Sequence, residues 1–199
     1  MRVSPWHAIA LLGVVTTPLA AQRPHRTGLW AELCNGPSLV RIASSASTEV
    51  TTKTGFGSCF RVGGTLSNKV LLGVETFGFL DKTFGFGTRD TSVVAETGTI
   101  AVVVLWFPWR SGFFLKGGVG TGQGKFTVFP SPGQPVVAEG VGVGLTYGLG
   151  FDLPISRKFA LTANAAAVVN AIGDLVLPTT RVEDVIATMY HVALGIAVR

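Results

Sequence analysis

The stretch Glu139-Gly-Val-Gly-Val-Gly-Leu-Thr-Tyr-Gly-Leu-Gly-Phe-Asp152 decides the fold. From Val141 to Phe151 its odd-numbered positions form a continuous apolar series, whereas most of its even-numbered positions are glycine. A period of two predicts a β-strand, although glycine in a strand costs backbone entropy and offers nothing to pack. A small membrane barrel resolves this conflict, because its outside must be apolar and its lumen is narrow. The stretch therefore predicts one strand of such a barrel.

The composition favours a barrel over helical membrane segments. Only 14% of the 199 residues are charged, and the mean hydropathy is +0.48. After the N-terminus, no run approaches the roughly 18 to 20 apolar residues of a membrane helix, and the strongest run, residues 100–107, is short and β-branched. The net charge of +5 comes from scattered Lys and Arg without the basic stripe of a nucleic-acid-binding protein. A soluble barrel of lipocalin type remains the alternative.

The N-terminal segment has the pattern of a secretory signal. Arg2 supplies the positive charge, residues 8–15 form the apolar core, and residues 16–21 form the small-residue exit. A membrane anchor is the alternative, but the apolar run is too short for one. We predict a signal peptide over residues 1–21, a short N-terminal segment over 22–27 and an outer-membrane β-barrel over 28–199. The mature chain is expected to enter an oxidising compartment.

Eight segments have strand character, and their connections alternate between short and long. The predicted strands are 28–35, 54–64, 69–80, 93–107, 113–122, 138–152, 158–171 and 187–198. Tight turns are predicted at 65–68, 108–112 and 154–157, and longer links at 36–53, 81–91, 129–135 and 173–184. Outer-membrane barrels have short periplasmic turns and longer outer loops. The predicted fold class is all-β, an eight-stranded antiparallel up-and-down transmembrane barrel.

Three segments carry a resemblance to a known family. They are Arg61-Val-Gly-Gly-Thr-Leu-Ser-Asn-Lys-Val-Leu-Leu-Gly-Val-Glu75, Gly112-Phe-Phe-Leu-Lys-Gly-Gly-Val-Gly120 and the strand over 142–152. They resemble the small bacterial outer-membrane β-barrel domain of OmpA/OmpX type, over most of residues 28–198. The resemblance implies a location in the bacterial cell outer membrane, contact with outer-membrane lipid, and insertion by the barrel-assembly machinery. One departure is the ending Ala197-Val-Arg199, where such barrels usually have Phe or Trp.

The inward-facing phase of the predicted strands collects four charged residues. They are Glu32, Arg61, Glu75 and Lys116, all at mid-depth of the lumen. Charges in a dry lumen must be paired, because an unpaired charge costs several kcal/mol. We therefore predict a lumen charge network of salt bridges that fills the barrel. The alternative is a charged constriction in a narrow pore.

Cys34 and Cys59 are the only cysteines of the chain. If Glu32 faces Arg61, the same register places the two cysteines opposite each other. In that position they can form a disulfide, which closes a loop of about 24 residues and contributes roughly 3 kcal/mol to stability. The alternative is two free thiols, because a disulfide between directly opposed strand residues can be strained. Without a nearby His or Asp they make a poor metal site. No metal and no cofactor are expected.

His191 is the lumen residue on which an enzyme would depend. It points inward in the outer half of the last strand, and Asn164 is a second polar lumen residue. An acyl hydrolase needs Ser, His and a carboxylate together, but the same-face neighbours Met189 and Ala193 supply no nucleophile. We interpret His191 as a hydrogen-bonded lumen residue and predict no catalytic residue.

These patterns predict a non-enzymatic outer-membrane barrel with a structural or surface-interaction role and a lumen filled by side chains. The alternatives are a narrow ion or small-solute pore and, less favoured, a lipid-modifying enzyme. An extracellular ligand would bind through the long outer loops. We expect a monomer and no nucleic-acid partner.

Overall fold

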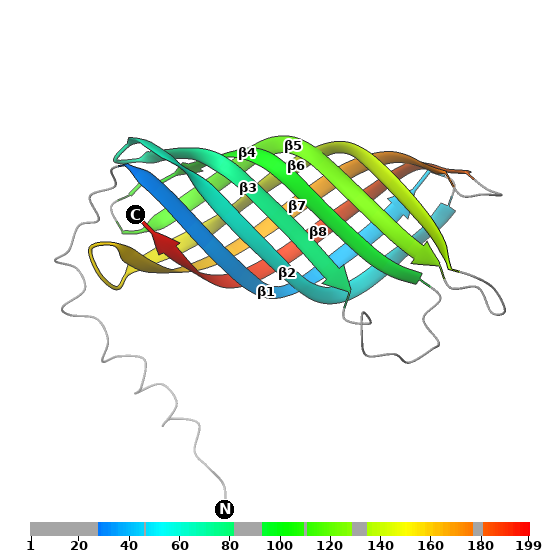
Figure 1. Ribbon diagram of the computed structural model, residues 1–199, viewed down its shortest axis with the longest axis horizontal. Helices are drawn as coiled ribbons and strands as arrows, with labels where there is room; N and C mark the ends of the chain where they lie inside the picture. The colour runs from blue at the N-terminus through cyan, green and yellow to red at the C-terminus, as the bar shows by residue number, and fades with distance from the viewer. Residues whose placement is uncertain (1–27, 46, 82–92, 110, 129–134, 177–180) are drawn as a thin grey trace, which may run out of the picture.

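The chain forms a closed barrel of eight antiparallel strands (Figure 1). The computed structural model describes residues 28–45, 47–81, 93–109, 111–128, 135–176 and 181–199. The strands are β1 (Leu29–Ser44), β2 (Ser47–Ser67), β3 (Val70–Asp81), β4 (Val93–Trp106), β5 (Phe113–Val128), β6 (Val136–Pro154), β7 (Phe159–Val176) and β8 (Arg181–Val198). Each strand pairs with the next, and β1 pairs with β8 to close the barrel. The predicted fold class is confirmed, while the predicted segments 1–21 and 22–27 lie outside the described residues.

No helix in the described part of the chain is long and apolar enough to cross a membrane.

β6 has the two faces that its alternating sequence predicts. Val141 and Tyr147 are 71% and 54% exposed on the outside of the barrel. On the inside, a Cβ on Gly150 would collide with the ring of Phe114, and one on Gly144 would come within 2.7 Å of a neighbouring methyl group. Glycine therefore recurs on this face because side chains from other strands occupy the space that its own side chains would need.

Three tight turns lie at one end of the barrel, together with the start of β1 and the C-terminus (Figure 1). We call this the turn end and the opposite end the loop end. In the β4–β5 turn, Gly112 has φ +94°, and a Cβ there would strike the carbonyl of Asp152, so the turn requires glycine. In the β6–β7 turn, Ser156 Oγ accepts hydrogen bonds from the amides of Lys158 and Phe159 at 3.3 and 3.1 Å. The three predicted turns are thus present, although the first lies at 68–69 rather than 65–68 and the third at 155–158 rather than 154–157.

Two of the predicted long links are wrong, because strands continue through them. β1 extends to Ser44 and β2 begins at Ser47, so most of the predicted link 36–53 is a paired hairpin. Residues 43–53 of this hairpin are mostly polar and rich in Ser and Thr, whereas Leu39, Val40 and Ile42 before them are apolar. Beyond the apolar part of a membrane barrel both faces contact water, so the alternation that identifies a strand is lost.

The second incorrect link is 173–184. β7 extends to Val176 and β8 begins at Arg181. The pairing shifts register between Ala171 and Gly173, and Gly173 has φ +77°. This bulge lies where the sequence analysis ended the strand, because a break in alternation looks like the end of a strand when the partner strand is unknown.

Phe77 and Phe79, which break the expected alternation of β3, face the lumen. They are 4% and 3% exposed, and the pairing of this part of β3 with β2 has no shift in register. Glycines on β2 make room for them. A Cβ on Gly57 would lie 2.9 Å from the Phe77 ring, and one on Gly55 would lie 3.0 Å from the Phe79 ring. The two rings therefore belong to the packing inside the barrel.

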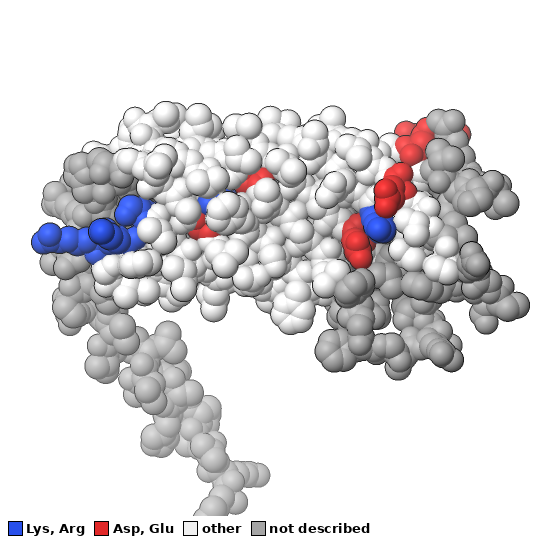
Figure 2. Space-filling view, viewed as in Figure 1, with Lys and Arg blue, Asp and Glu red and all other residues white. Residues whose placement is uncertain are grey.

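An apolar belt surrounds the outside of the barrel between its two ends. Its exposed residues include Leu33, Phe60, Val74, Ile100, Val102, Val119, Leu145, Leu161, Leu194 and Ile196. Trp106, Trp109 and Phe159 are exposed near the turn end, as expected of an interfacial girdle. Figure 2 shows the charged residues gathered mainly toward the two ends, with only small parts of charged side chains in view between them. The belt is therefore suited to contact with lipid.

Candidate functional site

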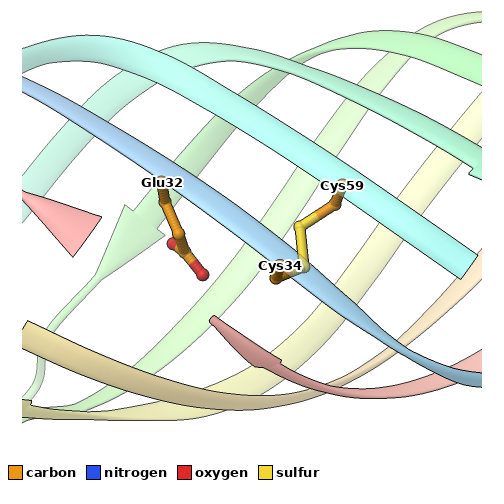
Figure 3. A group of neighbouring side chains, drawn as sticks. All are labelled: Glu32, Cys34 and Cys59. Carbon is orange, nitrogen blue, oxygen red and sulfur yellow. A yellow bond between two sulfur atoms is a disulfide. The ribbon is translucent and has the colours of Figure 1, made fainter. Parts of the chain in front are cut away.

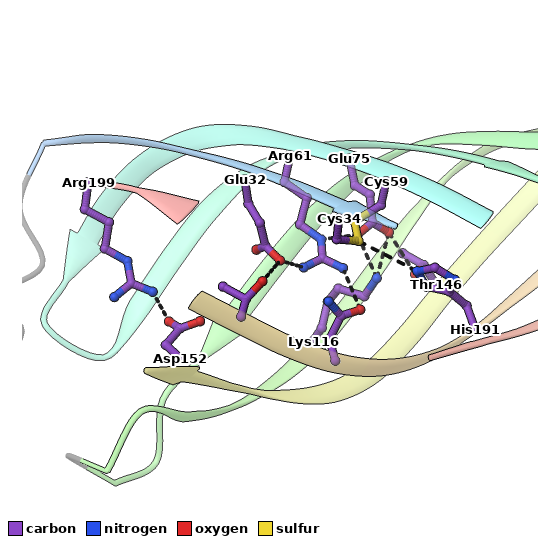
Figure 4. Close-up of polar contacts among 12 residues, drawn as sticks. Glu32, Cys34, Cys59, Arg61, Glu75, Lys116, Thr146, Asp152, His191 and Arg199 are labelled. Carbon is purple, nitrogen blue, oxygen red and sulfur yellow. Dashed lines mark hydrogen bonds and ion pairs between the residues drawn. A yellow bond between two sulfur atoms is a disulfide. The ribbon is translucent and has the colours of Figure 1, made fainter. Parts of the chain in front are cut away.

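The four predicted lumen charges lie together at the middle of the barrel (Figure 4). The strand register pairs Glu32 on β1 with Arg61 on β2, and Arg61 with Glu75 on β3. These side chains point inward because they share the inward phase of their strands. Lys116 reaches the same group from β5, on another part of the barrel wall.

Arg61 binds both carboxylates of this lumen charge network. Its Nη1 donates to Glu32 Oε1 at 2.9 Å, and its Nε donates to Glu75 Oε2. Lys116 Nζ donates to both carboxylate oxygens of Glu75, each at 2.7 Å. Two carboxylates and two cations make the network electrically neutral, and each of its charges is adjacent to an opposite charge.

Polar side chains from β6 and β7 complete the hydrogen bonding of the network. Thr162 Oγ1 donates to Glu32 at 2.9 Å, and Thr146 Oγ1 donates to Glu75 at 3.1 Å. Asn164, predicted as a polar lumen residue, accepts from Arg61 Nη2 at 3.5 Å. Side chains from β1, β2, β3, β5, β6 and β7 thus belong to the same group, which crosses the full width of the lumen.

The network is buried: Arg61 is 0% exposed, Glu75 1%, Glu32 3% and Lys116 6%. Charges removed from water in this way are tolerated only with close partners and well-formed hydrogen bonds. The arrangement therefore holds the strands together from inside, and removal of any one charge would leave an uncompensated net charge buried in the lumen.

Apolar side chains close the lumen on both sides of the network. The turn-end plug consists of Trp30, Leu71, Ala101, Val103, Leu105, Phe107 and Phe114. The loop-end plug consists of Cys34, Val40, Cys59, Phe77, Phe79, Val168, Met189 and Ala193. Closer still to the loop end, Ala95, Phe126, Ala138, Ile172, Leu175, Val185 and Ala187 form a further buried cluster. The turn-end plug also explains why β4 is apolar on both faces.

Cys34 and Cys59 form a disulfide between β1 and β2, with a Cα–Cα distance of 5.0 Å. The prediction of a disulfide in this register is confirmed. Figure 3 shows the bond beside Glu32, and the ligand atoms of the three residues lie within 4.8 Å of one another. Because the sulfurs are bonded to each other, neither is the thiolate that a metal ion would require.

His191 has a partner that the sequence analysis missed. Its Nδ1 shares a 2.9 Å hydrogen bond with Ser38 Oγ, and both residues are buried. Its Nε2 lies 3.7 Å from Cys34 Sγ, and the Phe77 ring packs edge-on at 4.9 Å. Ser38 was missed because the predicted strand ended at residue 35. In the Ser-His-Asp triad one ring nitrogen bonds the serine and the other bonds a carboxylate. Here Ser38 is on Nδ1, and the other nitrogen, Nε2, meets the disulfide sulfur instead of a carboxylate.

Asn170 is a second polar centre that the sequence analysis did not identify. It is 0% exposed. Thr99 donates to its Oδ1 at 2.8 Å, while its Nδ2 donates to Thr97 Oγ1 at 3.2 Å and to the carbonyl of Gly98 at 3.1 Å. The signal was available, because Asn170 shares the inward even-numbered phase of Asn164 on the same strand.

Comparison with solved structures shows the class of fold. The chain is similar to Neisserial surface protein A at 16% identity, over 86% of this chain and 97% of that chain, with a TM-score of 0.54. It is similar to Ail, the attachment invasion locus protein of Yersinia pestis, at 14% identity, over 86% of this chain and 98% of that chain, with a TM-score of 0.57. A further structure of Ail holds the heparin analogue sucrose octasulfate. No family model and no curated protein matches the chain.

The fold is therefore that of small, eight-stranded outer-membrane β-barrels. The apolar belt adds the chain's own chemistry to this likeness, and the bacterial outer membrane is the location that both support.

Proposed function

We propose that the protein is a non-enzymatic outer-membrane barrel with a structural or surface-interaction role, whose lumen is a packed core rather than a channel. One observation carries the proposal: the neutral charge network is buried between two apolar plugs. A conducting constriction needs charged groups that face water on both sides. Here the charges of Arg61 and Glu75 bind each other inside the core.

The test of the packed lumen is ion conductance in planar lipid bilayers. The purified protein is expected to produce no conductance steps under conditions in which a general porin does. Arg61→Ala is the informative variant, because a pore lined by this network would change its conductance or ion selectivity when the cation is removed. Wild-type steps that change with Arg61→Ala would support the pore and overturn the proposal.

The surface role depends on orientation, with the loop end outside the cell. The paired hairpins of β1–β2 and β7–β8 offer ordered backbone there, and a structure of Ail, a barrel of similar fold, holds a heparin analogue. Because both native cysteines are joined in a disulfide, an introduced cysteine becomes the single free thiol. Glu183→Cys should react with a membrane-impermeant maleimide in intact cells, whereas Arg157→Cys should react only after permeabilisation. The reverse pattern would contradict the orientation.

A lipid-modifying activity is the alternative to test, because Ser38 and His191 are hydrogen-bonded to each other. The pair is buried, and the second ring nitrogen of the histidine faces the Cys34 sulfur. We propose that the pair is structural. Lipid A from cells with the wild-type protein, with Ser38→Ala and without the protein should have one composition. A modification that requires Ser38 would establish an enzyme.

A further inference from the structure

The turn end of the barrel carries an exposed group of basic residues, for which the proposed function has no use. Lys69 lies in the β2–β3 turn, and Arg157 and Lys158 lie in the β6–β7 turn. All three are exposed. We call them the basic collar. Figure 2 shows basic side chains gathered at this end.

The backbone holds the two parts of the collar on one rim. The carbonyl of Lys69 accepts from the amide of Phe107 at 2.8 Å, and the carbonyl of Lys158 accepts from the amide of Arg199 at 2.9 Å. The Arg199 guanidinium lies 5.9 Å from the centre of the Phe107 ring. The two turns are therefore linked through packed residues, and their charges are displayed at the same end of the barrel.

In the part of the chain that the structure describes, no exposed acidic side chain lies on the rim of the collar. Among the described residues of the turn end, the one side-chain carboxylate is that of Asp152, which is buried and paired with Arg199 (Figure 4). The loop end differs, because Lys125 on that rim lies 3.5 Å from the Glu139 carboxylate and is paired across the strands with Glu96. The positive charge at the turn end is thus left for an external anion.

The collar lies at the depth of lipid head groups. Trp106, directly opposite Val70 in the strand register, and Trp109 are exposed at the same end, where aromatic residues mark the membrane interface. Long basic side chains at this depth extend their charge to the phosphate level while their stems contact the apolar region. Each basic residue near an anionic leaflet adds a favourable interaction that extends over about one Debye length.

We propose that the basic collar binds the head groups of anionic phospholipids in the leaflet at the turn end. This inference rests on the proposed membrane-barrel function. It predicts that the barrel selects its neighbouring lipids at this end by charge, with Lys69, Arg157 and Lys158 as the binding residues. On the orientation proposed above, this is the periplasmic leaflet.

The two exposed tryptophans provide a local measurement of this selection. Bromine on a lipid chain quenches a tryptophan that it contacts, so quenching in mixed vesicles gives the relative binding of brominated phosphatidylglycerol and brominated phosphatidylcholine. Trp106 and Trp109 are exposed at the turn end, whereas Trp30 is buried in the lumen, and Trp6 lies in the predicted leader. We expect phosphatidylglycerol to bind about three-fold or more tightly, and less so at high salt.

Two matched variants complete the experiment. Lys69→Gln/Arg157→Gln/Lys158→Gln should reduce the preference to about one-fold. Arg41→Gln/Lys53→Gln/Lys125→Gln removes the same charge from the loop end and should retain the wild-type preference. Equal binding of both lipids by the wild type, or a preference that survives the collar variant, would overturn the inference. Absence of quenching by either lipid would instead mean that the belt is not in the membrane, and the proposed function itself would fail.

Discussion

Glu75 is the residue on which the lumen charge network depends most, because it binds both cations. Replacement by Gln in Glu75→Gln keeps the shape but leaves Arg61 and Lys116 with one carboxylate between them in a buried site. We expect the free energy of unfolding, measured by urea titration in detergent, to fall by about 3–5 kcal/mol.

The matched control for this substitution is Glu139→Gln on the loop-end rim. Glu139 also pairs with a lysine, Lys125, but their side chains are 66% and 47% exposed. Water screens such a pair, so the same chemical change should cost less than about 1 kcal/mol. Equal effects at Glu75 and Glu139 would contradict the description of the network as buried and coupled.

The glycines of β5 allow a second prediction at the residue scale. A Cβ at Gly122 would collide with the side chain of Asn170, which is held by its hydrogen bonds to Thr97 and Thr99, whereas a Cβ at Gly117 would meet nothing within 4 Å. Gly122→Ala should therefore lower the free energy of unfolding by about 1–3 kcal/mol. Gly117→Ala should leave the free energy of unfolding nearly unchanged in the same urea titration. A larger loss of stability for Gly117→Ala than for Gly122→Ala would show that the two faces of β5 are assigned incorrectly.

Single residues could be placed from the sequence wherever the alternation was unbroken. Glu32, Arg61, Glu75 and Lys116 were assigned to the lumen because a period of two fixes which face a side chain occupies. Glu32, Arg61 and Glu75 then meet through the register of neighbouring strands, whereas the contact of Lys116 with Glu75 depends on the strand tilt and the barrel closure, which the sequence does not state. Ser38 was missed for a different reason: the predicted strand ended at residue 35, so no face of the barrel was assigned to it.

At the scale of elements, the disulfide joins β1 and β2 beside the network. We expect Cys34→Ala/Cys59→Ala to lower the free energy of unfolding by about 3 kcal/mol, because the bond restricts the unfolded chain between these strands. Since Cys34 and Cys59 are 0% and 1% exposed, reductant should leave the folded protein oxidised and should act only after unfolding. Thiol counting before and after denaturation checks the second expectation. A reducible bond in the folded state, or an unaltered stability, would contradict this account.

The strands themselves were predictable in their apolar parts but not in their extensions. The alternation of β6 and β8 is complete across the belt, so their existence and phase were fixed by the sequence pattern. The loop-end parts of β1 and β2 are stabilised by pairing with each other in a hairpin. Nothing in a single polar segment indicates that pairing, because the information lies in the partner strand.

The whole barrel followed from counting turns and faces, since an even number of strands with both ends at the turn side can close. The packing that seals the lumen could not be counted in that way. Val40 and Phe77, for example, come from strands that do not pair with each other. Which side chains meet across a lumen depends on the tilt and stagger of the closed barrel.

The central claim is that this chain forms a closed barrel in a membrane. Gel mobility of the protein extracted from cell envelopes tests it most directly, with boiled and unboiled samples compared alongside outer-membrane fractionation. The account predicts that the unboiled protein migrates as a compact band, that boiling shifts it to the position of an unfolded chain, and that the protein is found in the outer-membrane fraction. An unshifted band together with protein in the soluble fraction would mean that the apolar belt is not in contact with lipid.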